Sequence, residues 1–378
     1  KNVPELRFPG FEGEWEEKKL GNLTTKIGSG KTPKGGSENY TNKGIPFLRS
    51  QNIRNGKLNL NDLVYISKDI DDEMKNSRTY YGDVLLNITG ASIGRTAINS
   101  IVETHANLNQ HVCIIRLKKE YYYNFFGQYL LSRKGKRKIF LAQSGGSREG
   151  LNFKEIANLK IFTPTIFEEQ QKIGQFFSKL DQQIELEEQK LELLQQQKKG
   201  YMQKIFSQEL RFKDENGEDY PDWENSKIEK YLKERNERSD KGQMLSVTIN
   251  SGIIKFSELD RKDNSSKDKS NYKVVRKNDI AYNSMRMWQG ASGKSNYNGI
   301  VSPAYTVLYP TQNTSSLFIG YKFKTHRMIH KFKINSQGLT SDTWNLKYKQ
   351  LKNINIDIPV LEEQEKIGDF FKKMDILI

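Results

Sequence analysis

The feature that most constrains the fold of this chain is a long segment that occurs twice. Residues 168–184 read EEQQKIGQFFSKLDQQI and residues 362–378 read EEQEKIGDFFKKMDILI, with 11 of 17 positions identical and no gap. A weaker echo lies upstream of each copy, where Leu-Arg-Phe is followed by Trp-Glu. A period of about 200 residues is far too long for a solenoid. The repeat therefore indicates a duplicated domain followed each time by a connector.

The positions of the two copies predict the order of the parts. Residues 1–165 are expected to form a first globular unit, and residues 166–207 a helix. Residues 208–360 are expected to form the second unit, and residues 361–378 to begin a second copy of the helix.

The connector has the pattern of a long helix with one apolar seam. It contains no proline, and apolar or aromatic residues recur about every 3.5 residues between Glu, Gln and Lys. Forty residues in a helix would measure ~60 Å, and such a stripe needs a partner helix to cover it. The residues expected to pair or to dock a partner are Ile173, Phe177, Leu180, Ile184, Leu191, Leu194, Tyr201 and Ile205 in the first copy and Ile367, Phe371 and Met374 in the second.

The second copy of the helix is the expected partner of the first. Two copies of one unit are easily related by a pseudo-twofold axis, which would set their helices antiparallel. The alternative is that each helix packs only on its own domain. The length of the seam favours pairing, because one small globular unit would not cover it.

Both globular units have the pattern of an α/β or α+β fold. Short β-rich runs alternate with loops rich in Gly, Asn and Ser. The expected strands lie at Asp83–Ile88, His111–Arg116, Asp279–Tyr282 and Tyr305–Leu308, and the expected helices at Tyr121–Leu141 and Ser316–Phe332.

Charge and composition narrow the class of partner. The formal net charge is +15 and the sequence pI is about 9.4, which favours a polyanion. Nucleic acid is the usual polyanion and a membrane surface the competitor, although many basic proteins bind neither. No run approaches the roughly 18 apolar residues of a membrane span, and the first ten residues do not resemble a signal peptide. With Cys113 as its single cysteine, the chain is expected to be cytoplasmic, with no membrane partner.

The enzyme motifs in the sequence fail on spacing. Gly28–Thr32 resembles a phosphate loop, but the glycine required five positions before Gly30 is Thr25. His326 and His330 are spaced as in helical zinc sites, but no third ligand is apparent. We therefore expect no catalytic residue and no metal or cofactor site in this chain.

The remaining signals are those of DNA contact. Glycine-rich basic stretches and clusters of Lys and Arg suit phosphates, whereas arginine, amide and hydroxyl side chains on ordered loops suit base edges. Competing interpretations are a solvated helix end for the cluster at residues 133–138 and core packing for Trp288. The candidates for phosphate contact are Lys26, Lys31, Lys34, Arg133, Lys136, Arg137, Lys262 and Lys269, and those for base contact are Arg49, Gln51, Asn52, Thr89, Ser92, Arg95, Asn283, Arg286, Trp288 and Ser302.

Taken together, these patterns resemble the specificity subunit (HsdS) of type I restriction–modification systems, over essentially the whole chain. The resemblance lies in the duplicated Glu-Glu-Gln-x-Lys-Ile-Gly-x-Phe-Phe motif, in the run at Gly82–Gly94 and in Gly299–Tyr305. The duplicated motif is specific, whereas the two runs are less so. The chain departs from the family pattern at its second helix, which is only begun by Ile378.

The resemblance implies a function and a set of partners. Each unit would be a target-recognition domain for one half of a split double-stranded DNA site, and the helices would space the halves. The helices would also dock two methyltransferase subunits (HsdM) that carry S-adenosylmethionine, and the complex would include motor-nuclease subunits (HsdR) that use ATP and magnesium. Two other classes stay open: a nuclease or methyltransferase with an unrecognised site, and a coiled-coil assembly protein whose basic surface is incidental.

Overall fold

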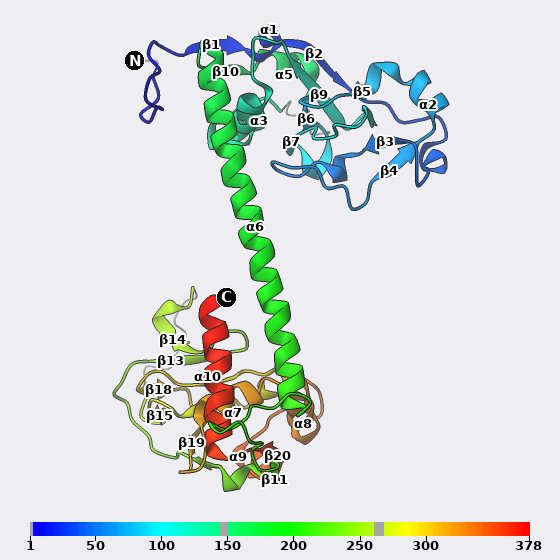
Figure 1. The fold of residues 1–378 in the computed structure, drawn as a ribbon. Coiled ribbons are helices and arrows are strands. Elements are labelled where there is room, and N and C mark those ends of the chain that lie inside the picture. The colour runs from blue at the N-terminus through cyan, green and yellow to red at the C-terminus, as the bar shows by residue number, and fades with distance from the viewer. Residues whose placement is uncertain (1–2, 144–149, 261–267) are drawn as a thin grey trace. The chain divides into compact units, whose positions relative to one another are not determined.

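The computed structural model describes residues 3–143, 150–260 and 268–378, and the chain divides into two compact units (Figure 1). Unit 1 comprises Lys1–Glu187 and unit 2 comprises Glu188–Ile378. The boundary falls inside one long helix, α6 (Phe167–Phe206), so each unit contains one half of it. Each unit is described below by itself.

Unit 1 is built on a four-stranded antiparallel sheet. Its strands, in spatial order, are β2 (Thr24–Ser29), β9 (Val112–Leu117), β6 (Val84–Asn87) and β7 (Thr96–Ile98). The expected strands at 83–88 and 111–116 are therefore confirmed. Both runs are apolar almost without interruption because both faces of this sheet are buried.

The two faces of the unit 1 sheet pack against different layers. Val84 and Leu86 face a cluster that contains the helix residues Phe125 and Phe126. Leu85 faces the opposite cluster. The second layer there is a mixed sheet of β4 (Val64–Ile66), β3 (Ile45–Leu48), β8 (Ala106–Leu108) and β5 (Arg78–Thr79), in that order.

Short elements complete unit 1. The two-stranded sheet of β1 (Glu16–Lys19) and β10 (Lys160–Thr163) joins the start of the unit to the segment before α6. The short helices are α1 (Leu20–Leu23), α2 (Lys68–Glu73) and α5 (Phe153–Asn158).

Unit 2 repeats this layering. Its central antiparallel sheet has the order β12 (Leu232–Glu234), β19 (Tyr305–Pro310), β16 (Ile280–Asn283) and β17 (Ser292–Lys294), which confirms the expected strands at 279–282 and 305–308. The other strands form three pairs. They are β13 (Leu245–Thr248) with β14 (Gly252–Lys255), β15 (Lys273–Val275) with β18 (Gly299–Val301), and β11 (Glu224–Lys227) with β20 (Asn355–Ile358).

The two helices expected after the strands were wrong as single helices. Residues 121–141 form α3 (Tyr123–Leu131) and α4 (Arg133–Leu141), because Ser132 adopts an extended conformation and its hydroxyl caps Gly135 N–H at 3.1 Å. The second expected helix, at residues 316–332, also divides into two, because Thr325 caps a new helix within this range. The two helices are α7 (Ser316–Lys322) and α8 (His326–Asn335). A separate short helix, α9 (Tyr348–Leu351), follows them in the chain.

Both copies of the repeated motif are helical, as predicted. The first begins α6, and the second forms α10 (Leu361–Leu377). Each copy is anchored to its own unit by a buried glutamate. Glu169 accepts hydrogen bonds from Arg7 and from Trp15 Nε1, and Glu363 accepts two from Arg211, with the shortest contact at 2.7 Å in both units.

A buried glutamine repeats the same anchoring in each unit. Gln170 Oε1 accepts a hydrogen bond from Tyr122 N–H, and Gln364 Oε1 accepts one from Ser315 N–H, both at 2.9 Å. One turn later, Gly174 lets α6 approach α3 closely, because a Cβ there would lie 2.9 Å from the backbone nitrogen of Phe125. Two helices thus attach to two domains through the same residues of the duplicated motif.

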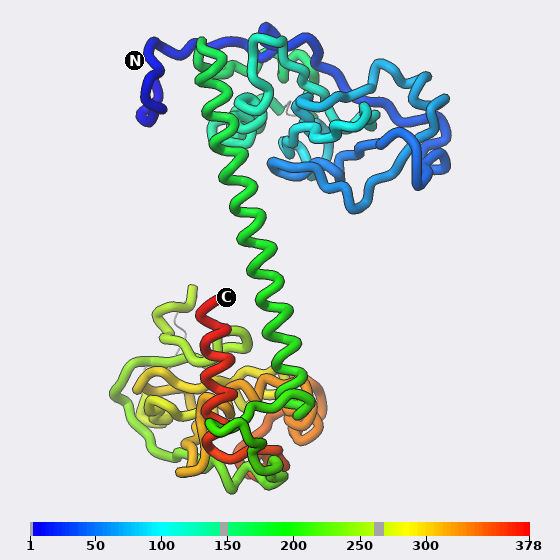
Figure 2. Tube along the Cα trace, in the orientation of Figure 1, coloured from blue at the N-terminus to red at the C-terminus, as the bar shows by residue number. Residues whose placement is uncertain are grey.

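In unit 2, the C-terminal half of α6 (residues 188–206) packs antiparallel to α10 (Figure 2). Phe206 stacks on Phe371 with ring centroids 5.7 Å apart, and Tyr201 meets Phe370 at 5.2 Å. Lys198, farther toward the start of α6, pairs with Asp375 near the end of α10. The order of these contacts confirms the predicted fold class, a mixed α/β fold with an antiparallel pair of long helices.

Candidate nucleic-acid interface

In unit 1, the turn between β6 and β7 collects three of the predicted contact residues. Thr89 and Ser92 are half-buried. Thr89 Oγ1 lies 2.6 Å from His111 Nδ1, and Ser92 Oγ accepts a hydrogen bond from Asn87 Nδ2 at 3.1 Å. Arg95 follows in the same turn and is also half-buried. The turn thus presents two hydroxyls and a guanidinium from a backbone fixed by its neighbours.

A second loop lies beside this turn. Asn87 Nδ2 also donates to Ser50 O at 2.9 Å, which places residues 49–52 against the end of β6. Gln51 is exposed there. Arg49 is held inside the loop, where it donates to Asp62 O at 2.8 Å and lies 5.5 Å from the ring of Tyr40.

Asn52 does not fit the prediction of a base contact. Its side chain is fully buried, and both ends of its amide are used, since Oδ1 accepts from Arg49 N–H at 2.8 Å and Nδ2 donates to Asn59 O at 2.9 Å. The residue shapes the loop that carries Gln51. An amide side chain at a turn has two common uses, in base contact or in closing the turn, and the sequence did not separate them.

The lysines of the glycine-rich stretch at residues 26–34 lie in two separate parts of unit 1. Gly30 lies against the neighbouring sheet, where a Cβ would be 1.7 Å from Leu108 O. Lys31 and Lys34 follow it and are exposed. Lys26 lies in β2 opposite Arg116 of β9, at the end of the sheet away from the β6–β7 turn. Its amine donates a hydrogen bond to Asn76 O. Burial lowers the pKa of Lys26, with Arg116 adding to the effect.

Two residues beside the turn were not among those predicted from the sequence to contact DNA. His111 contacts Thr89, and Gln110 accepts a hydrogen bond from the hydroxyl of Thr32. Both precede β9, whose first residue, Val112, pairs with Asn87 at the end of β6. Only the pairing of β6 with β9 brings them to the turn, and no local pattern in the sequence signals that pairing.

The basic cluster of unit 1 forms the exposed side of helix α4. Arg133, Lys136 and Arg137 are exposed, whereas Ile139 is buried and lies 3.5 Å from the position of a Cβ at Gly94. The helix is therefore seated on the turn between β6 and β7. This contact makes α4 a neighbour of the turn that carries Thr89, Ser92 and Arg95.

Unit 2 presents a corresponding turn between β16 and β17. Asn283 is half-buried and accepts a hydrogen bond from Met285 N–H at 3.0 Å, while Arg286 is exposed. Trp288 is half-buried, with its ring 5.2 Å from that of Trp344 and its indole N–H on Met285 O at 3.1 Å. Trp344 was not predicted. It comes from the loop after α8 and holds Trp288 in place.

Helix α8 sits on its turn as α4 does, and a lysine ties the two together. A Cβ at Gly290 would lie 3.2 Å from Ile329 of α8. Lys324 donates hydrogen bonds to Gly290 O and Ile249 O, and burial lowers the pKa of its amine to about 8. This lysine stabilises the turn and is not free for phosphate contact.

The remaining candidates are placed as follows. Ser302 precedes β19, in which Tyr305 pairs with Asn283, so it lies at the same end of the sheet as the turn. Lys269 is half-buried. Lys262 lies outside the described residues.

The described residues hold no group of three or more His, Cys, Asp and Glu side chains that could bind a metal ion. His326 and His330 are both exposed on α8. A search of the same residues finds no helix with the length and apolar character needed to span a membrane.

Comparison with known proteins gives a family and a fold. The family model for the type I restriction modification DNA specificity domain matches residues 12–196 and 220–378. The putative type I restriction enzyme MjaX specificity subunit of Methanocaldococcus jannaschii is 27% identical over 231 residues, which are 58% of this chain and 53% of that protein. This chain therefore spans about half the length of that relative.

Two solved structures share the fold. The S subunit of the type I restriction–modification system from M. genitalium aligns with a TM-score of 0.60 and 14% identity, over 99% of this chain and 92% of that one. A structure from work on complex assembly and conformational transition of the type I R-M system aligns with a TM-score of 0.51 and 15% identity, over 99% and 92%. At these identities the likeness is one of fold.

Proposed function

The chain belongs to the type I restriction–modification DNA specificity family, and on this premise we propose that its two units each read one half of a bipartite DNA site. Recognition of DNA is what the family implies. The division of labour between residues 1–165 and 208–360, the spacing of the halves and the docking of other subunits are the parts that this proposal adds.

One observation carries the proposal: in each unit a basic helix packs on a polar turn at the corresponding end of that unit's own central sheet. In unit 1 the contact is between Ile139 of α4 and Gly94, and in unit 2 between Ile329 of α8 and Gly290. Cations on a helix suit phosphates, and hydroxyl, amide and guanidinium groups on a rigid turn suit base edges. A duplicated reading surface is what a site in two halves requires.

In unit 1, we assign base contact to the exposed and half-buried side chains around the β6–β7 turn. Arg49 and Asn52 hold the neighbouring loop and act through its shape. The phosphate contacts come from exposed cations of α4 and of the stretch after β2. The residues proposed for base contact are Gln51, Thr89, Ser92 and Arg95, and those for phosphate contact are Lys31, Lys34, Arg133, Lys136 and Arg137.

In unit 2, Arg286 is the leading candidate for direct base reading. It is exposed on the turn, and a guanidinium can pair with guanine through two hydrogen bonds. Asn283 and Ser302 flank it, and Trp288 holds the turn rigid or contacts a base by its face. Replacing Arg286 with Ala should relax preference at a single position by about tenfold.

Methylated-site mapping is the readout for Arg286, in cells that supply the cognate methyltransferase. The expected result is added methylation at sites that differ at one position. A uniform fall at all sites, with no change in sequence preference, would place Arg286 on the phosphates and contradict the assignment.

Helix α6 is proposed to set the distance between the half-sites. It is a continuous helix of 40 residues, ~60 Å at 1.5 Å per residue. Seven residues inserted after Glu187 keep the seam in register and add ~10 Å. The spacer between methylated half-sites should then grow by about three base pairs, and an unchanged spacer would exclude this role.

We assign the catalytic steps to the proposed partner subunits. We propose that two methyltransferase subunits (HsdM) dock on the helices and bind S-adenosylmethionine, and that motor-nuclease subunits (HsdR) join through the complex with ATP and magnesium. The chain itself would contribute recognition and no catalytic residue. Purified chain mixed with DNA, magnesium and S-adenosylmethionine should then show no methylation or cleavage, whereas added methyltransferase subunits should restore site-specific methylation.

A further inference from the structure

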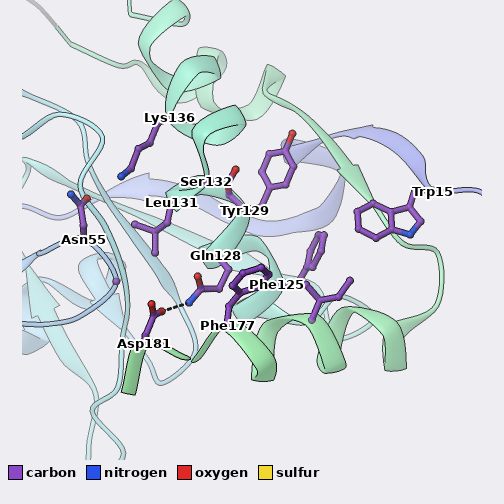
Figure 3. A pocket seen from close by; sticks show the side chains of 12 residues that line it. Trp15, Asn55, Phe125, Gln128, Tyr129, Leu131, Ser132, Lys136, Phe177 and Asp181 are labelled. Carbon is purple, nitrogen blue, oxygen red and sulfur yellow. Dashed lines mark hydrogen bonds between the residues drawn. The ribbon is translucent and has the colours of Figure 1, made fainter. Parts of the chain in front are cut away.

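Apolar side chains are exposed in two regions of the molecule that have different surroundings. In unit 1 they line an open groove between α3, α4 and the N-terminal half of α6, and this groove belongs to the seam that predicted helix pairing (Figure 3). In unit 2 an exposed apolar side chain, Met285, lies instead on the β16–β17 turn, directly before Arg286. Its place on a turn proposed to read DNA requires an explanation in terms of the bases.

The β6–β7 turn of unit 1 and the β16–β17 turn of unit 2 share one backbone frame. Residues 87–94 align with residues 283–290 without a gap, and each stretch begins at an asparagine and ends at a glycine with a φ of +85°. The asparagine N–H donates across the turn in both units, to Arg95 O and to Ala291 O, each at 2.9 Å. Side chains at equivalent positions of the two turns can therefore be compared directly.

At equivalent positions the two turns carry different chemistry. Met285 stands where unit 1 has Thr89, and Trp288 stands where unit 1 has Ser92. Unit 1 thus offers hydroxyls that can hydrogen-bond to the edges of bases, whereas unit 2 offers apolar groups beside the guanidinium of Arg286. The two turns therefore suit half-sites of different composition.

The backbone of Met285 is fixed, so its side chain is presented at a defined place. Its N–H donates to Asn283 Oδ1 at 3.0 Å, and its carbonyl accepts a hydrogen bond from Trp288 Nε1 at 3.1 Å. The ring of Trp288 is held in turn by the ring of Trp344, 5.2 Å away. Because both backbone groups of Met285 are paired within the turn, its side chain, 43% exposed, is held ready for a partner outside the chain.

The charges near Met285 favour DNA as that partner. Arg286 is exposed beside it, and the amine of Lys333 on α8 lies 5.8 Å from the ring of Trp344. In the major groove the bases present hydrogen-bonding groups and one methyl group, the C5 methyl of thymine. A methionine next to an arginine therefore matches a thymine near a guanine.

We propose that unit 2 reads a thymine methyl with Met285, within two base pairs of a guanine that Arg286 contacts. Neighbouring Cα atoms are about 3.8 Å apart and neighbouring bases of one strand about 3.4 Å, so adjacent residues reach adjacent base pairs. The inference rests on the proposed function and adds the chemistry of one half-site.

The test uses the full chain assembled with its methyltransferase subunits and duplexes that carry the mapped methylation site. In the half-site that Arg286→Ala relaxes, each thymine is replaced in turn by deoxyuridine, which lacks only the C5 methyl. One replacement, within two base pairs of the relaxed position, should weaken binding about fourfold, the effect of losing one buried methyl. Equal binding of all the deoxyuridine duplexes overturns the proposal.

Substitutions in the protein assign the effect to one side chain. Met285→Ala should bind the thymine and deoxyuridine duplexes equally, whereas Met285→Leu should keep most of the difference because it retains an apolar side chain. Ile249 is the matched control, since it is 44% exposed on the β13–β14 turn and its carbonyl shares the amine of Lys324 with Gly290 O. Ile249→Ala should keep the difference. Loss of the difference in Ile249→Ala, with its persistence in Met285→Ala, overturns the assignment.

Failure of this inference is distinguishable from failure of the proposed function. A complex that binds all duplexes alike, whatever their sequence, would contradict DNA reading by the two units. Sequence-specific binding that is intact but indifferent to every thymine methyl would contradict the Met285 contact alone. If Met285→Ala then also weakens assembly with the methyltransferase subunits, the side chain belongs to a protein interface and the proposed thymine contact is wrong.

Discussion

The N-terminal half of α6 and helix α10 have nearly the same sequence but different surroundings. Each is anchored by the same face, through Glu169 and Gln170 or Glu363 and Gln364, all buried. On the other face the two differ, since Phe177 is 45% exposed and Phe371 is fully buried. Both copies of the motif therefore attach a helix to its own unit, and the copy in unit 2 also packs against a second helix.

The comparison separates what the motif determines from what its partner determines. The anchoring face is closed by residues of the same unit, so it is equally buried in both copies. The receiving face is closed only where a second helix lies on it, as the C-terminal half of α6 lies on α10. Substitutions at matched positions can test this distinction, beginning with the largest expected effect.

Truncation of the phenylalanine on the receiving face, Phe371 or Phe177, should lower the free energy of unfolding strongly only in unit 2. Phe371→Ala removes a buried ring stacked on Phe206 and should lower the free energy of unfolding by about 3–5 kcal/mol. Phe177→Ala should lower it by under ~1 kcal/mol, because the ring is already half in solvent. Denaturant unfolding followed by tryptophan fluorescence compares the two. Equal losses would contradict the difference in packing.

Removal of the anchoring arginine should affect both units, with a larger effect in unit 2. Arg211→Ala leaves buried Glu363 without its partner and should cost about 2 kcal/mol, since the Arg211 side chain is 21% exposed. Arg7→Ala should cost less, because Trp15 still donates to Glu169 at 3.2 Å. Thermal unfolding of the two variants gives the order, and the reverse order would rule out this role of Trp15.

Lys322 provides a pH-dependent test in unit 2 alone. Its amine is buried 5.3 Å from the ring of Phe206 and 4.9 Å from that of Trp223, and burial lowers its pKa to about 8. The unfolded chain binds this proton more tightly, so the contribution of Lys322 to stability rises with pH between about 8 and 10.5.

Replacement of Lys322 with an apolar residue should therefore raise the free energy of unfolding most at lower pH. Lys322→Met should raise stability by about 1 kcal/mol at pH 7.5, and the advantage should shrink by pH 9.5. Denaturant midpoints of the variant and the parent chain at both pH values give the difference. A difference that does not change with pH would show that the amine does not titrate in this range.

The smallest effect is expected on the exposed helix cations. Arg137 of α4 is exposed, whereas Arg327 of α8 already pairs with Asp357 at 3.1 Å. Arg137→Ala should weaken DNA binding about threefold and reduce the salt dependence by about one ion. Arg327→Ala should do less. Binding titrations at several salt concentrations compare them, and a larger effect at Arg327 would contradict the assignment of phosphate contacts.

The sequence predicted the parts of the fold that leave a periodic or repeated pattern. The duplication located both helices to within a residue at most ends, and the apolar runs located the central strands. The breaks at Ser132 and Thr325 were missed, because a capping hydroxyl inside an apolar pattern looks like any surface residue.

The candidate site was less predictable, for a physical reason. Strand pairing brings Gln110 and His111 to the turn of unit 1, and a loop after α8 brings Trp344 to Trp288. Both are contacts between residues distant in sequence. Asn52 shows the converse, since its local pattern suited a base contact while its burial assigns it to the loop.

The most direct test of two independent reading units is to exchange residues 208–360 for those of another family member with a different site. The methylated sequences are then mapped in cells that supply the methyltransferase. One half-site should change, while the other half and the spacer length stay the same. A change in both halves, or in neither, would contradict the claim that each unit reads its own half of the DNA site.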